Sequence, residues 1–600
     1  MVDDNRQFVD VAYSIGTRTK SFFLILLLLL LAHSYGGKNP AYLSHARPRR
    51  DIRWKAYAFR RLLPTSFSKI TGSSSRKIAV YAIVGIVAVV AVYIFMSARG
   101  GPALNGAQDQ GTAREEVTQR FKQQFCGTNT APNSNAYITE VTLPNECEMP
   151  LGIAADGGRV WYVSTKRGVL GSYDTSAGKF SEYEIPQWPS RQLPFAAVPS
   201  WSMSWDVKLD GSGNVWFTDQ NNTIWRFNKS TDHFDMFKVP AKYPSTLDFD
   251  RQGNIYFIGI NSQSLFFGDL SKMKNTTSDG FTEIRLPLDA FSGINLELVT
   301  SGGLVVDNQH NNVWVSLLSF QAKKGELLLY DIGSHQVTKI VDLPPELGAP
   351  VGMELDNSGN LWVADHGTST FFKYNPTNGN ITKFVTSIAS SKIFGGSTPS
   401  AAYTLPYWIH KGADGSLWFN EHTGNKIARF DPQNLTMVEY WIPSQNRGWA
   451  ICPEGASPCG IANAMQFTTG PNNQIWFTEW TENKIAKLDA SKQVPIEVSA
   501  PVEFAVEKGQ SKEIKLTISA SSNFTGQMMA AGTFMPNAGL GNSTGVFSEQ
   551  SVSVTPGVSK EISYTFTPAE DLSQGQQYTI MVGTGNDDIS YMRAVKVNIL

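Results

Sequence analysis

The chain has 600 residues, several times the roughly 100–200 residues of an ordinary domain, so two or more packed units are expected. Its 51 Lys and Arg nearly balance its 52 Asp and Glu, but residues 1–100 hold 15 of the basic and only 4 of the acidic side chains. The rest of the chain is therefore acidic, which excludes a broad basic surface for a nucleic-acid backbone.

The N-terminal region, residues 1–77, is followed by an uncharged apolar stretch at 78–97. Those 20 residues, at about 1.5 Å each, match the roughly 30 Å of a hydrocarbon core and predict a transmembrane helix. Residues 38–77 carry 11 Lys and Arg and one acid, so the positive-inside rule keeps residues 1–77 cytoplasmic. We expect a single-pass anchor in the cell membrane with all later residues extracellular. A short apolar run at 22–32 is better matched to a signal-peptide core or an interfacial segment.

Residues 98–135 are rich in Gly, Ala, Gln and Asn and predict a juxtamembrane stalk. All four cysteines follow the membrane segment, in two short-range pairs, Cys126 with Cys147 and Cys452 with Cys459. Three connectivities are possible, and disulfides within each pair are favoured over a zinc site in an oxidising exterior. Asn-x-Ser/Thr sequons would carry glycans if the host glycosylates; they are Asn221, Asn228, Asn275, Asn380, Asn434, Asn523 and Asn542.

A phrase of an apolar strand, an Asp/Asn/Gly turn, an aromatic-rich strand and two further strands recurs between residues 136 and 492. The aromatic that opens the second strand of each copy is Trp161, Trp216, Tyr256, Trp314, Trp362, Trp418 or Trp476. Seven copies spaced 40 to 58 residues apart predict a seven-bladed β-propeller, in which these aromatics pack between blades. An extra strand at 135–144 is expected to complete the last blade and close the ring.

Residues 493–600 alternate apolar and polar positions between Gly, Pro, Asn and Ser turns and contain no Trp. This pattern predicts an immunoglobulin-like β-sandwich. The fold class is therefore all-β: a propeller followed by a sandwich and preceded by a transmembrane helix.

Two repeats, "LWFNEHTGNKIARFDP" (417–432) and "IWFTEWTENKIAKLD" (475–489), resemble those of the streptogramin (virginiamycin B) lyase family, and more distantly NHL-repeat and gluconolactonase-like propellers. The resemblance implies a seven-bladed propeller and, in the enzymes, a magnesium-assisted elimination that opens the ester of a cyclic depsipeptide. It also implies catalytic histidines in a Pro-His-x-Ile phrase about eleven residues before the repeat tryptophan. Here those positions hold Leu151, Trp205, Ser245, Val351, Tyr407 and Met465, and "SGGL" at 301–304. None is His.

Acidic residues often end the second strand of a repeat, where they should share one rim of the ring; they are Asp219, Asp365, Glu421 and Glu479. Such carboxylates could hold Mg²⁺ or Ca²⁺, or each could satisfy backbone N–H groups in its own turn. His366, His410 and His422 are the nearby candidates for proton transfer, although a solvated or hydrogen-bonded role is as ordinary for each. The sequence contains no GxSxG, P-loop or HExxH motif.

Because the histidines implied by the resemblance are missing, we expect a diverged module that binds a small molecule, glycan or protein at the propeller rim. A metal-dependent lyase or lactone hydrolase that uses the rim carboxylates with His410 or His422 is the first alternative. A structural protein of the cell envelope is the second.

Overall fold

The computed structural model describes residues 119, 122–127, 131–192, 202–387, 403–449, 459–470, 474–521, 526–533 and 539–600. The predicted anchor at 78–97, the run at 22–32, most of the stalk, Cys452 and Asn523 lie outside these residues. Across the described ranges, no helix is long and apolar enough to cross a membrane.

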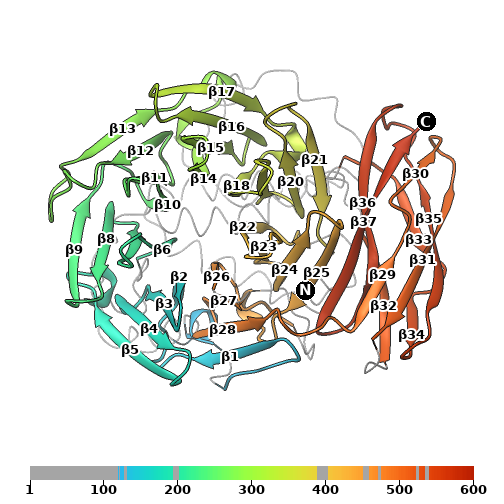
Figure 1. Cartoon of the computed structure of the whole chain (residues 1–600), viewed down its shortest axis with the longest axis horizontal. Helices are drawn as coiled ribbons and strands as arrows, with labels where there is room; N and C mark the ends of the chain where they lie inside the picture. The colour runs from blue at the N-terminus through green and yellow to red at the C-terminus, as the bar shows by residue number, and fades with distance from the viewer. Residues whose placement is uncertain are drawn as a thin grey trace, which may run out of the picture. The chain divides into compact units, whose positions relative to one another are not determined.

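Consecutive strands of the chain form four-stranded antiparallel sheets that follow one another around a ring (Figure 1). In chain order the sheets contain β2 (Pro150–Asp156), β3 (Arg159–Ser164), β4 (Val169–Asp174) and β5 (Lys179–Glu184); β6 (Val207–Leu209), β7 (Val215–Asp219), β8 (Thr223–Asn228) and β9 (His233–Lys238); β10 (Pro244–Phe249), β11 (Ile255–Gly259), β12 (Ser264–Gly268) and β13 (Phe281–Arg285); β14 (Thr300–Asp307), β15 (Asn312–Ser319), β16 (Lys324–Asp331) and β17 (Gln336–Asp342); β18 (Pro350–Leu355), β19 (Leu361–Asp365), β20 (Thr370–Tyr374) and β21 (Ile381–Val385); β22 (Pro406–Lys411), β23 (Leu417–Glu421), β24 (Lys426–Asp431) and β25 (Thr436–Trp441); and β26 (Phe467–Thr469), β27 (Gln474–Glu479) and β28 (Lys484–Asp489) with β1 (Ile138–Thr142). Short 3-10 helices stand at η1 (Pro189–Gln192), η2 (Asp289–Phe291), η3 (Leu296–Leu298), η4 (Pro345–Leu347) and η5 (Arg447–Trp449). This arrangement is a β-propeller.

The aromatic that opens the second strand of each repeat packs between neighbouring sheets, as the sequence predicts. Trp161 lies 5.8 Å from Phe227 of the next sheet, and Trp362 lies 5.5 Å from Phe430, measured between ring centroids. The turn before the strand fixes the aromatic, because the carboxylate of Asp356 accepts hydrogen bonds from Ser358 N, Asn360 N and, at 2.8 Å, Trp362 Nε1. The recurring Asp turn and the tryptophan are therefore one structural unit.

The N-terminal strand closes the ring. β1 pairs with β28 in antiparallel register from Ile138↔Leu488 to Thr142↔Lys484, and β28 belongs to the last repeat. A disulfide joins Cys126, before β1, to Cys147, after it. Both the expected closure and the first expected disulfide are confirmed, and Cys459 is also disulfide-bonded.

The C-terminal region consists of two sheets that share one apolar core. Their strands are β29 (Ile496–Ser499), β31 (Lys512–Ala520), β35 (Lys560–Thr567) and β33 (Thr544–Phe547) in one, and β37 (Ile589–Ile599), β36 (Gln577–Gly585), β32 (Gly526–Thr533) and β34 (Ser551–Val554) in the other, with β30 (Glu503–Val506) parallel to β37. The sequence does not predict the junction with the propeller: β37 pairs with β25, from Thr436↔Arg593 to Tyr440↔Ile589. One sheet is thus continuous from the propeller into the C-terminal region.

The innermost strands β14, β18 and β22 approach so closely that glycine is required between them. A Cβ at Gly303 would lie 1.7 Å from the Val351 carbonyl oxygen, and one at Gly352 would lie 2.2 Å from that of Tyr407. We predict that Gly303→Ala lowers the free energy of unfolding by about 1–3 kcal/mol, because the backbone must shift to admit the methyl group. Gly211→Ala, where a Cβ would meet nothing within 4 Å, is the matched control in urea unfolding. Equal stability of the two variants would contradict the close approach.

Candidate functional site

The end of the second strand lies beside the start of the first strand in several repeats, as expected from the sequence. Pro350 pairs with Asp365, and Pro406 pairs with Glu421. Residues that follow the second strand therefore meet residues that begin the first strand. Trp205, Tyr407, His366 and His422, which we call the rim cluster, meet in this way: Tyr407 lies 4.5 Å from His366 and 6.2 Å from Trp205, and His366 lies 4.9 Å from His422.

Most positions that the family resemblance assigns to catalytic histidines are filled by packing residues, and Ser245 is a buried hydroxyl. Leu151 is fully buried beside Phe125 and Trp480, and Val351 is buried against Leu318 and Ala364. Trp205 and Met465 pack on the same cluster as Leu151, whereas Tyr407 belongs to the rim cluster. In the fourth repeat, positions 302 and 303 have no space for a side chain, since a Cβ atom at either would meet a backbone carbonyl.

Two of the four rim carboxylates, Asp219 and Asp365, are bound within their own surroundings. Asp219 accepts hydrogen bonds from Asn221 N at 3.0 Å and Ser202 Oγ at 3.0 Å. Asp365 accepts them from Ala349 N at 2.9 Å and Thr368 Oγ1 at 2.9 Å, while burial raises its pKa to about 6. Nowhere in the described ranges do three or more His, Cys, Asp or Glu side chains stand where they could hold a metal ion. Local hydrogen bonding of each carboxylate is the alternative that the sequence analysis leaves open, and it holds for Asp219 and Asp365. Binding of Mg²⁺ or Ca²⁺ stays a prediction.

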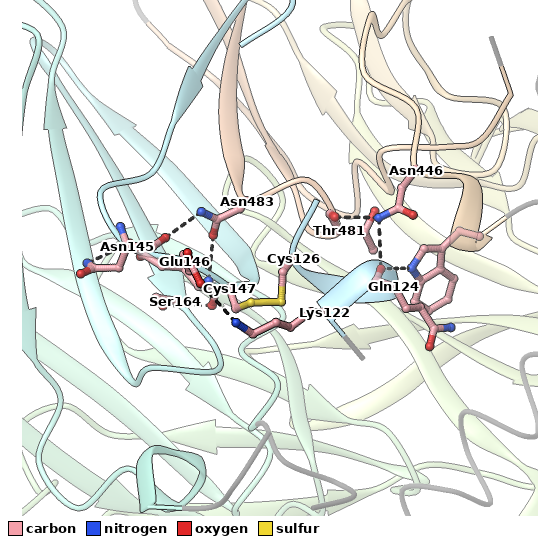
Figure 2. The surroundings of a disulfide bond; sticks show 12 residues. Lys122, Gln124, Cys126, Asn145, Glu146, Cys147, Ser164, Asn446, Thr481 and Asn483 are labelled. Carbon is pink, nitrogen blue, oxygen red and sulfur yellow. Dashed lines mark hydrogen bonds and ion pairs between the residues drawn. A yellow bond between two sulfur atoms is a disulfide. The ribbon is translucent and has the colours of Figure 1, made fainter. Parts of the chain in front are cut away.

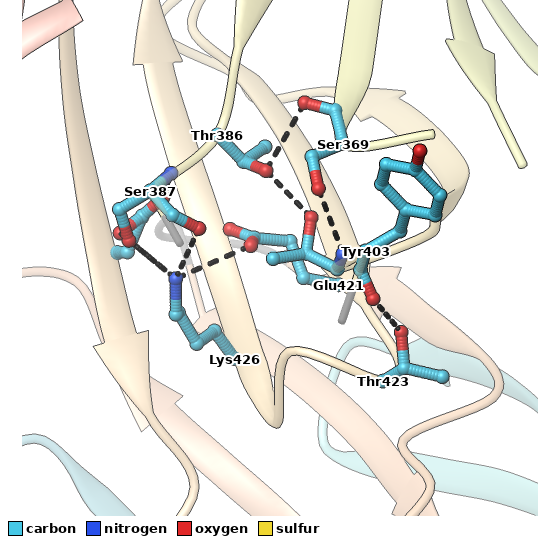
Figure 3. A network of polar contacts seen from close by, with 9 residues as sticks. Ser369, Thr386, Ser387, Tyr403, Glu421, Thr423 and Lys426 are labelled. Carbon is cyan, nitrogen blue, oxygen red and sulfur yellow. Dashed lines mark hydrogen bonds and ion pairs between the residues drawn. The ribbon is translucent and has the colours of Figure 1, made fainter. Parts of the chain in front are cut away.

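Glu421 takes part in a fully buried ion-pair network (Figure 3). Lys426 Nζ lies 3.4 Å from Glu421 and 3.1 Å from Glu439, and it also donates to Ser387. One cation thus serves two carboxylates, and burial together with the Glu439 charge raises the pKa of Glu421 to about 8. Next to it, Lys484 pairs with Glu140 at 2.8 Å, and burial and the Glu140 charge raise the pKa of Glu479 well above its usual range.

We predict that Glu421 makes the protein less stable as the pH rises. Its pKa is raised on folding from 4.5 to about 8, so its stabilising contribution is complete below about pH 4.5 and is lost as the pH passes through about 8. Glu421→Gln mimics the protonated acid and should reduce the fall in unfolding free energy between pH 5.5 and 8.5 by more than about 1 kcal/mol. Urea unfolding of both proteins at those pH values measures the difference, and parallel pH profiles would contradict it.

A cavity of about 240 Å³ lies among the innermost strands β6, β10, β14, β18 and β22. Its lining includes Lys208, Asp248, Glu354 and His410, and Lys208 Nζ lies 3.2 Å from the Asp248 carboxylate. Burial lowers the pKa of His410 to about 3, so its ring is neutral near pH 7. Sequence reasoning identified His410 but missed Lys208, Asp248 and Glu354, which line the same cavity. Their position in the repeat could have found them, because each lies opposite the repeat aromatic of the second strand, as Glu354 lies opposite Trp362.

The N-terminal turn, Lys122–Cys126, packs through Phe125 on the aromatic cluster next to the rim. Figure 2 shows its disulfide and the hydrogen bonds at Gln124. Phe125 is 7% exposed and makes edge contacts with Trp449 at 5.2 Å and Trp480 at 5.3 Å. The Gln124 carbonyl accepts hydrogen bonds from Trp449 Nε1 and Asn446 Nδ2. The turn is therefore held by aromatic packing, backbone hydrogen bonds and the disulfide of Cys126.

The sheets and this rim define a β-propeller with a two-sheet C-terminal region. No family model and no curated protein matches the chain. Among solved structures, virginiamycin B lyase from Staphylococcus aureus is similar at 22% identity, over 58% of this chain and 98% of that one, with a TM-score of 0.42. A catalytically inactive variant of that lyase with quinupristin is similar to the same degree, and the WD40 β-propeller domain of Doa1 matches at 10% identity over 60% and 99%, with a TM-score of 0.40. The resemblance to streptogramin lyases thus has a structural counterpart, which at this identity concerns the fold alone.

Proposed function

We propose that the protein is a single-pass membrane protein whose extracellular part, a seven-bladed propeller with an immunoglobulin-like sandwich, binds a ligand at the rim without catalysing a lyase reaction. One observation carries the proposal: none of the positions that the resemblance assigns to catalytic histidines holds His, and Gly303 stands where the Val351 carbonyl excludes any side chain. Each missing acid or base normally supplies roughly 100- to 10,000-fold in rate.

The geometry favours a small polar ligand over an extended surface contact. The cavity presents a cation, two carboxylates and the Tyr407 ring within about 240 Å³, and small-molecule sites typically combine apolar walls with a few polar groups of this kind. Trp205 and Tyr407 stack 6.2 Å apart beside it and supply flat faces for a sugar or another ring.

Turnover and binding can be measured on the full-length protein in detergent. We expect no opening of a streptogramin B ester or of a lactone panel, with or without Mg²⁺, and binding of at least one compound in a sugar and small-molecule screen. Tyr407→Ala should weaken that binding at least tenfold, whereas Tyr578→Ala in the C-terminal region should not. Metal-dependent ester opening that is lost in Glu421→Gln would overturn the proposal in favour of the lyase alternative.

The lyase alternative depends on His410 or His422 as the base. Burial lowers the pKa of His410 to about 3 and lowers the pKa of His422 well below its usual range. A base whose conjugate acid is this strong removes protons poorly near neutral pH. The lowered pKa values of His410 and His422 therefore support binding over catalysis.

A further inference from the structure

His366 and His422 lie against one another at the ends of two neighbouring second strands. The proposed ligand site does not use the ring nitrogens of either histidine. Their ring centroids are 4.9 Å apart, and the ring planes differ by 29°. Tyr407 approaches His366 edge-on at 4.5 Å. Two imidazoles from separate strands of the fold thus meet at one point on the rim.

Each of the two rings has one buried nitrogen without a hydrogen-bond partner. Nδ1 of His366 and Nδ1 of His422 are both buried and unpaired. A neutral imidazole carries a lone pair on one of its two nitrogens, so an unpaired Nδ1 can serve as a ligand atom.

Neither neighbouring carboxylate supplies the missing partner. Asp365, which precedes His366, binds Ala349 N and Thr368. Glu421, which precedes His422, binds Lys426. Burial lowers the pKa of His366 to about 4, and burial with a contribution from His366 lowers the pKa of His422 well below its usual range. Both rings are therefore neutral near pH 7, the form in which imidazole coordinates metals.

We propose that His366 and His422 together bind one divalent transition-metal ion through their Nδ1 atoms. Unpaired buried polar atoms are rare in native proteins and call for a missing partner such as an ion or water. Imidazole nitrogen suits Zn²⁺, Co²⁺, Ni²⁺ and Cu²⁺, whereas Mg²⁺ and Ca²⁺ prefer oxygen ligands. Since the described residues bring two imidazoles to this point, the other coordination positions are left for water or for a donor atom of an incoming ligand.

The test is a titration of the full-length protein, purified in detergent without a histidine tag and treated with EDTA. Co²⁺ is followed by its visible absorption, and Zn²⁺ by competition with bound Co²⁺. We expect one equivalent to bind to the wild type, and affinity to fall at least tenfold in both His366→Gln and His422→Gln. His233→Gln is the matched control, because His233 is 65% exposed and lies outside the cluster.

Each outcome decides the proposal. Loss of binding in both variants with unchanged binding in the control supports it, as does a melting temperature that rises with Zn²⁺ and not with Mg²⁺. Absence of Co²⁺ and Zn²⁺ binding to the wild type overturns it and leaves water as the partner of the two nitrogens. Unchanged binding in either variant also overturns it, and a variant that fails to fold is replaced by the Asn substitution at the same position.

Discussion

Lys426→Met should lower the free energy of unfolding by about 3–5 kcal/mol, because it removes the buried cation that pairs with Glu439 and hydrogen-bonds to Glu421. Lys426 Nζ lies within 3.4 Å of Glu421 and 3.1 Å of Glu439, and all three side chains are completely buried. The substitution also removes the donor to Ser387, so the network in Figure 3 loses its centre. Urea unfolding monitored by tryptophan fluorescence measures the change.

Lys515→Met is the matched control for that experiment. Lys515 and Glu561 form an ion pair at 2.6 Å, but their side chains are 63% and 55% exposed. Exposed pairs of this kind contribute only about 0–1 kcal/mol. If the two variants lost similar stability, the Lys426 network would not be the buried, water-excluded arrangement that the structure gives.

The architecture of the propeller could be predicted from sequence because its determinants are local and repeated. The Asp356 turn, the Trp362 that it binds and the flanking strands lie within one phrase, and Trp362 packs on Phe430 of the next sheet as Trp161 packs on Phe227. The junction between β25 and β37 could not be predicted this way. Strands of similar apolar alternation are interchangeable at a sheet edge, so which distant strand pairs with β25 is decided by tertiary packing.

The rim carboxylates show the limit of reading a site from strand ends. The sequence places Glu421 and Glu479 at equivalent positions, and the structure confirms that equivalence, but Glu421 pairs with the buried Lys426 and Glu479 lies opposite the buried Lys484 in strand register. The lysines stand in the "NKIA" phrase that follows each acid and look like ordinary surface residues in a polar turn. Only the outer-strand partners Glu439 and Glu140 indicate burial, and Glu140 is 344 residues away from its lysine in the chain.

Removing the disulfide should have the second large effect, on both stability and the position of the N-terminal turn. Cys126 and Cys147 are 21 residues apart. Opening a loop of this length gives the unfolded chain additional entropy, which lowers the stability of the folded state by about 3 kcal/mol. We expect the Cys126→Ser, Cys147→Ser double variant to lose about that much unfolding free energy. Its tryptophan emission should also shift to the red, because Phe125 no longer covers Trp449 and Trp480.

The fluorescence change separates release of the turn from general destabilisation. Phe125→Ala keeps the disulfide but removes the aromatic contacts of the turn, so it should reproduce part of the red shift at a stability cost of its own. Limited trypsin digestion after Lys122 should be faster in the double variant under conditions where the rest of the fold stays intact. If the double variant kept the wild-type emission and digestion rate, the turn would be held by the Trp449 and Asn446 hydrogen bonds to Gln124 alone, and the disulfide would act only on the unfolded chain.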